Sequence, residues 1–291
     1  MAPIRAVHTP EYLDFLQSAW VEWRKIEGAS EDVLPYIFPV RGMDNAYPTS
    51  VVGRAGYHMH DAWAPIGEHT WTVAVASANL ATEAAERVLV GERAAYALCR
   101  PSGHHASADM GGGNCFLNNA ATAAQHLRKG FGRVALIDVD VHHGNGSQGI
   151  FYRRNDVLFV SLHRDPIDYH PYFVGHAHER GEGDGLGFNL NLPLATNSGD
   201  EAFLAALDVA CARIEASGAE ALVISLGVDA HEADPTTGLA VTFDGFRRIG
   251  ARLSELSLPT VIIQEGGYNM DTIARCVAVT LAGFEGRKSA A

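Results

Sequence analysis

The stretch that decides the fold is Asp138–Gly146, DVDVHHGNG. It follows the apolar run Val134–Ile137, which is typical of a strand buried in a parallel sheet. The Gly-Asn-Gly at its end cannot continue a strand, so the acids and histidines lie at the carboxyl end, where open α/β sheets place ligand sites. Asp140 and His142 are two residues apart and point to the same side of an extended backbone. This pair therefore indicates a divalent metal site.

Three other apolar runs end in polar clusters of the same kind. We predict strands near 95–99, 221–226 and 260–264, and they lead into Arg100–His105, Leu226–Ala230 and Glu265–Tyr268. A single Asp-x-His pair is common by chance, and core packing explains the strands. Core packing does not explain why each strand delivers polar groups at the same end. The four clusters together favour a site built by the sheet.

Strand and helix patterns alternate from residue 95 onward, which predicts an α/β fold with a mostly parallel sheet and helices on both faces. Further strands are predicted near 134–138, 157–161 and 188–192, and helices near 118–129, 145–153, 200–216, 242–254 and 270–284.

The first third of the chain is less regular. A helix begins after Thr9, and another runs from a capping Thr70 to about Val90. Residues 27–56 show no sustained period, so we expect 27–71 to be a loop-rich lid or interface region. Residues 285–291 resemble a frayed tail. No linker, repeat or low-complexity run divides the chain, so residues 1–291 are predicted to be one domain.

Composition excludes several classes of protein. The net charge is −12 and Lys and Arg do not cluster, which argues against nucleic-acid or anionic membrane surfaces and favours cationic partners. No apolar run reaches the ~18 residues of a membrane span, and the chain start lacks the apolar segment of a signal peptide. The scattered cysteines form no Cys-x-x-Cys and indicate reduced thiols, so we expect a cytoplasmic protein; they are Cys99, Cys115, Cys211 and Cys276.

With these clusters in hand, the sequence resembles the arginase-fold zinc deacetylases, which include the histone deacetylases and the bacterial acetylpolyamine amidohydrolases. The resemblance spans about residues 4–284 and implies a single-domain arginase/deacetylase fold. The motifs occur in the family's order and are Arg100–His105, Gly113–Asn119, Asp138–Gly146, Ser161–His163, Gly227–Asp229 and Glu265–Tyr268. The region before Trp71 is most similar to the acetylpolyamine branch.

The resemblance implies a catalytic metal. Asp140, His142 and Asp229 match the ligands of one Zn²⁺, and three protein ligands leave a position for water and substrate. A potassium ion is a further candidate cofactor. Family members bind it through residues that match Asp138, Ser161 and the backbone of Leu162.

The resemblance also implies a pair of catalytic histidines. His105 would be the general base and then the acid to the leaving amine, with His104 as an electrostatic helper. Asp138 matches the carboxylate that orients His104, and Asn145 matches the partner of His105. Amide hydrolysis needs a nucleophile at neutral pH, which zinc supplies by lowering the pKa of bound water to about 7, and a proton shuttle, for which histidine is suited.

Four further positions concern the substrate. Tyr268 matches the tyrosine that donates to the substrate carbonyl, and the carbonyl of Gly113 would accept from the scissile amide. Asn114 and His170 stand where many deacetylases place two aromatics around the acetyl-lysine stem. We therefore expect a more polar tunnel and a small polar or cationic amide as the substrate. The resemblance to the acetylpolyamine branch implies a small acylated amine such as an acetylpolyamine.

Three alternatives remain open at this stage. The protein could be a protein-lysine deacetylase, which would need an open rim. It could be a metal-free scaffold, which the intact ligand set disfavours. It could also be a two-manganese ureohydrolase, for which Asp138 is a free bridging acid, although the His-His pair and Tyr268 favour one zinc.

The start of the chain bears on assembly. Relatives carry roughly one strand and one helix before the residue that matches Val7. Either the fold begins one strand short, or residues 1–8 and 27–56 cover the sheet edge. Because an open edge must be covered, we expect a homo-oligomer whose interface is formed by 27–56 and 57–71, close to the mouth of the active site.

Overall fold

Buried apolar runs build one sheet. The computed structural model describes residues 1–40, 42 and 46–286, and within them six strands pair in the order β1-β6-β5-β2-β3-β4. Every neighbouring pair is parallel, so the predicted mostly parallel α/β sheet is confirmed. The strands are β1 (Ala94–Ala97), β2 (Val134–Asp138), β3 (Val157–Arg164), β4 (Asn189–Leu194), β5 (Ala221–Leu226) and β6 (Thr260–Gln264).

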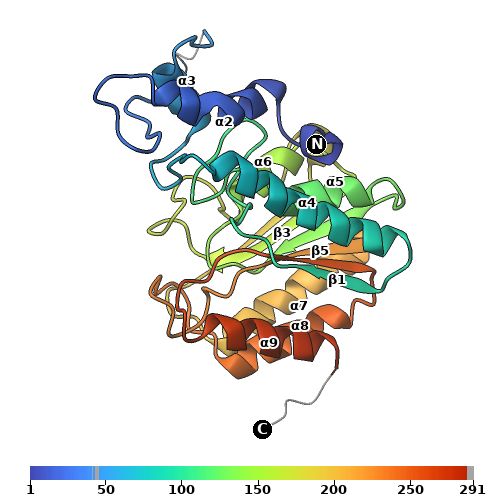
Figure 1. Ribbon diagram of the computed structural model, residues 1–291. Coiled ribbons are helices and arrows are strands. Elements are labelled where there is room, and N and C mark those ends of the chain that lie inside the picture. Colours follow the sequence, from blue (N-terminus) through green and yellow to red (C-terminus); the bar gives the residue numbers. More distant parts are fainter. Residues whose placement is uncertain (41, 43–45, 287–291) are drawn as a thin grey trace.

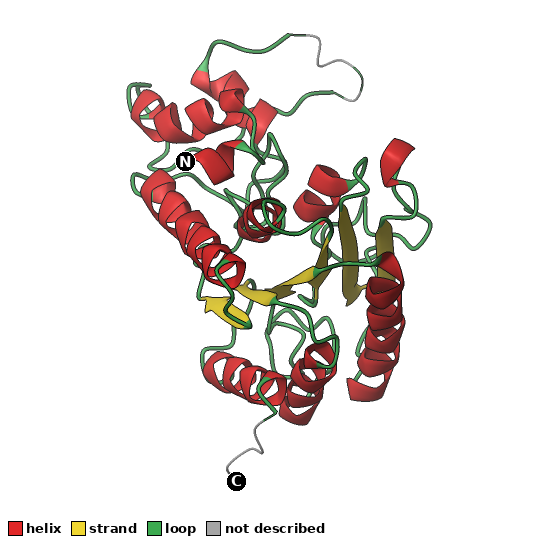
Figure 2. Cartoon of the chain, turned by 90° about the vertical axis from the view of Figure 1, so that its right-hand side faces the viewer, coloured by secondary structure: helices red, strands yellow, loops and turns green. Residues whose placement is uncertain are grey.

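Alternating side chains of each strand face two separate cores. On β2, Ala135 and Ile137 face one core and Val134 and Leu136 face the other. The first core is closed by α7 (Asp200–Ser217), α8 (Phe243–Ser254) and α9 (Ile273–Phe284), and the second by α4 (Thr70–Leu89), α5 (Asn119–Leu127) and α6 (Asn145–Phe151). Figures 1 and 2 show these helix layers on opposite sides of the sheet, as predicted.

A third hydrophobic cluster lies beyond the sheet. It joins α2 (Pro10–Trp23), α3 (Val51–His58) and the first turns of α4. The prediction of a loop over 27–56 is therefore wrong for α3. Gly53 and Gly56 hide its helical period, and its start is marked by the hydroxyl of Ser50, which accepts from the amide of Val52.

Smaller corrections concern element ends. Thr70 is the first residue of α4 rather than its cap, and its hydroxyl accepts from the amide of Gly67 at 2.9 Å. The strand predicted near 95–99 ends at Ala97. The helix predicted from 270 begins at Ile273, which leaves 265–272 irregular. Of the predicted tail, residues 287–291 lie outside the described residues.

Cover of the sheet edge by residues 1–8 and 27–56, one of the two alternatives, is not formed by the described residues of these segments. Helix α1 (Ala2–Arg5) packs against α5, and α3 packs against α2, so these segments lie on the far side of α4 from β1 (Figure 1). In the part of the chain that the structure describes, β1 and β4 are the edge strands. No described helix is long and apolar enough to cross a membrane.

Candidate active site

Two neighbouring strands deliver the predicted metal ligands. Asp140 and His142 follow β2, and Asp229 follows β5. Because β2 and β5 pair in parallel, with Asp138 opposite Ser225, the segments beyond them leave the same edge of the sheet. The ligand atoms of Asp140, His142 and Asp229 all lie within 4.8 Å of one another and are buried. The Nδ1 atom of His142 is 3.0 Å from Asp140 Oδ1 and 3.3 Å from Asp229 Oδ2.

The electrostatics of this triad favour a bound cation. Burial, followed by the charge of Asp140, raises the pKa of Asp229 to about 6. Burial would lower the pKa of His142, but the two carboxylates outweigh it and raise that pKa to about 9. Asp229 Oδ2 accepts no well-aligned hydrogen bond from the described residues, because the nearby Nδ1 of His142 bonds to Asp140 Oδ1, and a buried oxygen of this kind is costly. A divalent cation would satisfy it, and two carboxylates with one imidazole form the kind of three-ligand set that catalytic zinc sites use.

The tandem histidines follow β1 and have different partners. His104 Nδ1 is 2.9 Å from Asp138 Oδ2, whereas His105 Nδ1 is 2.6 Å from Asn145 Oδ1. An amide oxygen only accepts, so Nδ1 of His105 must hold the proton and Nε2 is left as the acceptor. The structure therefore brings both predicted histidine partners into contact with their histidines.

These partners separate the protonation states of the two rings. Burial would lower the pKa of His104, but the carboxylates of Asp138 and Asp140 outweigh it and hold that pKa well above its usual value. Burial, followed by the positive charge of His104, lowers the pKa of His105 well below its usual value. One ring is thus suited to hold charge and the other to accept a proton, which is the pattern of an acid–base pair.

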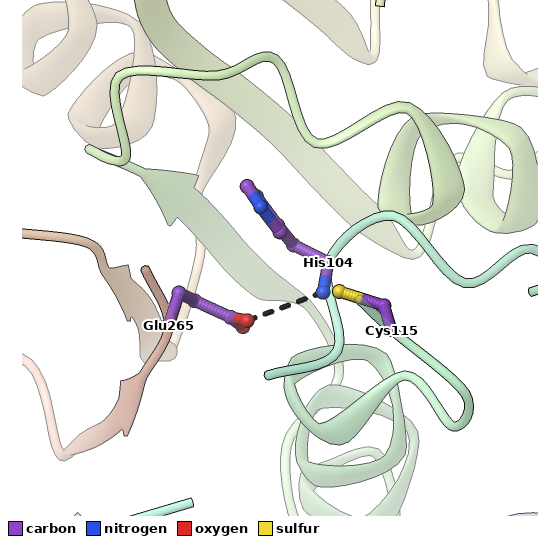
Figure 3. Close-up of side chains that lie close together, drawn as sticks. All are labelled: His104, Cys115 and Glu265. Atoms are coloured by element: carbon purple, nitrogen blue, oxygen red, sulfur yellow. Dashed lines mark hydrogen bonds between the residues drawn. The ribbon is translucent and has the colours of Figure 1, made fainter. Parts of the chain in front are cut away.

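The buried carboxylate of Glu265 binds the backbone of the loop that carries His104 and His105. Glu265 Oε2 accepts from the main-chain nitrogens of Gly103 at 2.7 Å and His104 at 3.2 Å, as Figure 3 shows for His104. Cys115 lies beside them, and burial raises the pKa of its thiol to about 12, which disfavours a nucleophilic role. Its sulfur with Glu265 and His104 also forms a compact group, but the carboxylate is already used by main-chain donors and by Ser225.

The site opens into a cavity of about 230 Å³. The three predicted substrate-binding residues line it. The metal-ligand candidate His142 and the catalytic candidates His105 and Tyr268 line it as well. A larger cavity of about 390 Å³ lies at the outer edge of β1 and contains none of the predicted site residues. The residues lining the smaller cavity are Trp63, His105, Gly113, Asn114, His142, His170, Pro235, Thr236 and Tyr268.

Sequence reasoning did not place Pro235 or Thr236 at this cavity, and it did not predict the ring contact that Trp63 makes. Trp63 stacks on His170, with ring centroids 5.5 Å apart and planes 11° apart. The tunnel is therefore not purely polar, because an indole stands beside the imidazole. No local pattern could have revealed this contact, since the two rings are far apart in the chain and meet only through the fold.

The carboxylate of Asp61 contacts two residues that line the cavity and come from different segments of the chain. Its Oδ2 accepts from the amide of Gly113 at 2.8 Å and lies 3.7 Å from Nε2 of His170. Burial would raise the pKa of Asp61, but the contact with His170 and the charge of His60 outweigh it and lower that pKa. The region 57–71 thus supplies a carboxylate that fixes the loop of Gly113.

Tyr268 lies on the irregular segment between β6 and α9, directly after Gly266 and Gly267. Gly267 has φ +150°, and a Cβ there would come within 2.6 Å of Val228, so the approach requires glycine. Burial, followed by the charges of Asp229 and Asp140, raises the pKa of Tyr268 well above its usual value. The phenol therefore stays protonated and can donate a hydrogen bond.

The candidate potassium residues lie on two adjacent strands, β2 and β3. In the β2–β3 ladder Asp138 is opposite Ser161, and Leu162 follows, so these buried residues come together. The hydroxyl of Ser161 is 2.8 Å from Nδ1 of His163. Asp138 is not a free acid, because Oδ1 accepts from the amide of Asp140 and Oδ2 contacts His104. Its use as a bridge between two metals is thereby disfavoured.

Known proteins are similar to nearly the whole of this chain. Residues 1–284 match the histone deacetylase domain family. The chain is 49% identical over 287 residues to acetylpolyamine amidohydrolase 1 of Pseudomonas aeruginosa, covering 98% of this chain and 83% of that protein. It is 47% identical over 285 residues to the acetylpolyamine amidohydrolase of Burkholderia pseudomallei, with coverage of 98% and 83%.

Solved structures agree with these relatives. A crystal structure of the acetylpolyamine aminohydrolase from Burkholderia pseudomallei matches with a TM-score of 0.95 and 45% identity, covering 99% of this chain and 84% of that one. The HD domain of HDA15 matches with a TM-score of 0.80 and 28% identity, covering 100% and 75%. The sequence, the fold and the grouping of site residues lead to one conclusion: the chain belongs to the histone deacetylase family of hydrolases.

Proposed function

We propose that this protein is a zinc-dependent amidohydrolase that removes the acetyl group from acetylated polyamines. The observation that carries the proposal is that one cavity is lined by a neutral imidazole, a protonated phenol and His142, whose ring contacts the buried carboxylates of Asp140 and Asp229. The relatives named for acetylpolyamines support the choice of substrate, because each aligns with nearly the whole of this chain.

Hydrolysis needs an activated water and a proton carrier. Zinc held by Asp140, His142 and Asp229 would lower the pKa of a bound water and polarise the acetyl carbonyl. His105 would accept the proton of the attacking water at Nε2, because its Nδ1 proton is held by Asn145. The same proton then passes from Nε2 to the leaving amine.

Other side chains would stabilise the charge that develops. The phenol of Tyr268 would donate to the oxygen of the former carbonyl as it becomes negative. His104, kept charged by Asp138, would add a positive field. The carbonyl of Gly113 would accept from the N–H of the scissile amide, and the bond from its own amide to Asp61 would hold this peptide in place.

The residues at the mouth of the cavity, here called the rim, favour a substrate with a cationic amine over one with an apolar chain. Trp63 is 61% exposed and presents its indole at the mouth of the cavity, where it can contact an ammonium group. Asp61 and the overall charge of −12 add negative potential around it. A polyamine carries several cationic groups along its chain, so a second ammonium of the substrate would be attracted to this rim.

A potassium ion is a second proposed cofactor, and its support is the placement of Asp138, Ser161 and Leu162 on adjacent strands. Asp138 links this position to His104, so the ion would affect the histidine pair through one carboxylate. Activity measured in potassium and in tetramethylammonium buffers tests this assignment.

We also propose a homo-oligomer that uses the region 27–71. This region exposes several large apolar side chains, and contiguous exposed apolar surface is typical of protein interfaces. Those residues are Tyr36, Ile37, Phe38, Val40, Tyr47 and Trp63. Light scattering at micromolar concentration should give a mass above that of one chain, and a monomer would contradict the proposal.

The buried, free cysteines are compatible with a reducing, cytoplasmic environment.

Turnover of a substrate panel tests the proposed function. The zinc-loaded protein is assayed against acetylated polyamines, acetyl-lysine peptides and other small acetylated amines, with metal content measured by mass spectrometry. We expect one zinc per chain and the highest kcat/KM for acetylated polyamines. A preference for acetyl-lysine peptides would make it a protein deacetylase, and a folded protein that binds no metal would indicate a scaffold.

A further inference from the structure

Asp234 is a buried acid that the mechanism above does not use. It is 2% exposed and lies in the turn that follows the metal ligand Asp229. Its Oδ2 accepts from the main-chain amide of Tyr268 at 2.9 Å and from that of Asn269 at 3.2 Å. One carboxylate oxygen therefore contacts the backbone of the very residue that is proposed to donate to the substrate.

The segment of Tyr268 needs an external support. It has no regular secondary structure, and the two preceding glycines leave its backbone many accessible conformations. The phenol makes no hydrogen bond to any residue that the structure describes, so packing and the backbone set its position. Asn269 provides a second link, because its side-chain amide donates to the carbonyl of Ala233 at 2.7 Å.

The other oxygen of Asp234 is fixed within its own turn. Oδ1 accepts from the amide of Thr236 at 3.0 Å and from its hydroxyl at 2.9 Å. The same hydroxyl lies 3.2 Å from the carbonyl oxygen of Asp229. This local closure orients the carboxylate, so that Oδ2 faces the Tyr268 segment with little freedom to move. The backbone at Tyr268 is thereby tied to the turn that follows Asp229.

We propose that Asp234 is the positioning residue of Tyr268, which it holds over the metal-ligand set through the Tyr268 amide. This inference rests on the proposed function, because it assigns Asp234 no role apart from the phenol. A donor that shifts by about 1 Å can lose on the order of 100-fold in rate. Asp234 should therefore affect kcat far more than KM.

A double-mutant cycle tests the inference on the zinc-loaded full chain with acetylated polyamine as the substrate. Asp234→Asn replaces one acceptor oxygen with an NH₂ group, which would face main-chain N–H donors. We expect kcat to fall about 10- to 100-fold in the wild-type background. In the Tyr268→Phe background the same change should cost less than about threefold, because the phenolic donor is already gone.

The matched control is Asp200→Asn. Asp200 accepts from the amide and the hydroxyl of Thr242 at 2.8 and 2.7 Å, so its carboxylate binds the same kinds of donor but joins the starts of α7 and α8, outside the cavity. We expect it to lower the melting temperature and to leave kcat unchanged. Asn269→Ala removes only the second link and should reduce kcat less than Asp234→Asn does, again only when the phenol is present.

The outcomes separate the possible failures. Equal losses from Asp234→Asn in both backgrounds, or a loss of zinc from that variant, would overturn the positioning role while the proposed function stands. If Tyr268→Phe itself retains full turnover, the proposed role of the phenol fails and the inference fails with it. Should Asp234→Asn not fold, the same cycle is run with Asn269→Ala, and additive losses there are equally contradictory.

Discussion

The indole of Trp63 stacks on the imidazole of His170, with ring centroids 5.5 Å apart and planes 11° apart. One ring comes from the region before α4 and the other from the segment between β3 and β4. Because the stacked pair lines the cavity, the position expected to be polar has an aromatic neighbour. The tunnel can therefore contact both a methylene chain and a cation.

This contact predicts how Trp63 affects substrate binding. Trp63→Ala should raise KM for an acetylated polyamine about two- to fivefold with little change in kcat, because a cation–π contact at an exposed ring contributes roughly 0.5–1 kcal/mol. Trp63→Phe keeps an aromatic face and should recover most of the loss. Steady-state kinetics decides the question, and an unchanged KM in the alanine variant would show that the substrate does not contact the indole.

Substrate preference should respond to His170. His170→Phe would restore an apolar wall and shift the preference toward acetyl-lysine peptides, since apolar burial stabilises by about 25 cal/mol per Å². The double change Asn114→Phe, His170→Phe should shift it further but destabilise the protein, because Asn114 has φ 62° and a phenylalanine there is strained. The ratio of kcat/KM for the two substrate classes is the measurement. No shift in either variant would contradict the tunnel argument.

We expect that the loss of one metal ligand abolishes zinc binding without unfolding the protein. Asp229→Ala should lose stoichiometric zinc and activity but remain folded, because removing one of two close carboxylates also relieves their repulsion. Mass spectrometry for metal and circular dichroism for folding measure the two properties. The exposed Asp208→Ala, which removes only a contact with Arg252, is the control and should keep its zinc. A zinc-loaded Asp229→Ala would refute the ligand assignment.

Tyr268→Phe isolates the proposed oxyanion donor. The change removes one hydroxyl and leaves the metal ligands intact, and the loss of such a donor costs on the order of 10²–10³ in kcat. Zinc content should be that of the wild type. Turnover close to wild type would mean that Tyr268 is a packing residue.

His8 predicts a pH dependence of stability. Its Nδ1 lies 3.3 Å from the carbonyl oxygen of Ala108 and its Nε2 accepts from the amide of Asn118, so the ring is neutral when it makes both bonds. Burial lowers its pKa to about 4, against about 6.5 in an unfolded chain. The folded state therefore binds this proton less readily, and the contribution of His8 is fully present above about pH 6.5 and is lost as the pH falls toward 4.

The test compares melting temperatures of wild type and His8→Gln from pH 7 to 4. Glutamine can replace both hydrogen bonds but does not titrate, so the wild type should lose up to about 3 kcal/mol of its relative stability across this range. The exposed His69→Gln carries the same substitution away from the buried ring and is the control. A pH-independent gap between wild type and His8→Gln would contradict the prediction.

Some elements could be predicted because their residue pattern is compatible with only one kind of secondary structure and burial. Val134–Ile137 is apolar at every position, which suits a strand covered on both faces, and the structure places it there. The eight-residue α3 escaped prediction because its two glycines weaken the helical signal and its stability depends on packing against α2.

The site likewise contains residues that could be predicted from the sequence and residues that could not. His104, His105 and Tyr268 could be placed together because each lies just beyond a strand of one parallel sheet. Trp63 and Asp234 could not, because their partners are set by how irregular segments fold over the sheet. Asp234-Pro235 reads in sequence as an ordinary surface turn, and only the structure shows that its carboxylate is buried.

The two ends of the parallel sheet offer different opportunities for chemical labelling. The residues that line the site cavity lie on segments that follow the strands or on the region before α4, so the turns that enter the strands at the opposite end are available for attachment. Lys129 lies in one such turn and is exposed, whereas burial raises the pKa of Cys99 and Cys276 to about 12 and suppresses their reactivity. A Lys129→Cys variant would therefore carry one readily alkylated thiol, and a fluorophore or a solid support attached there would leave the substrate entrance unobstructed.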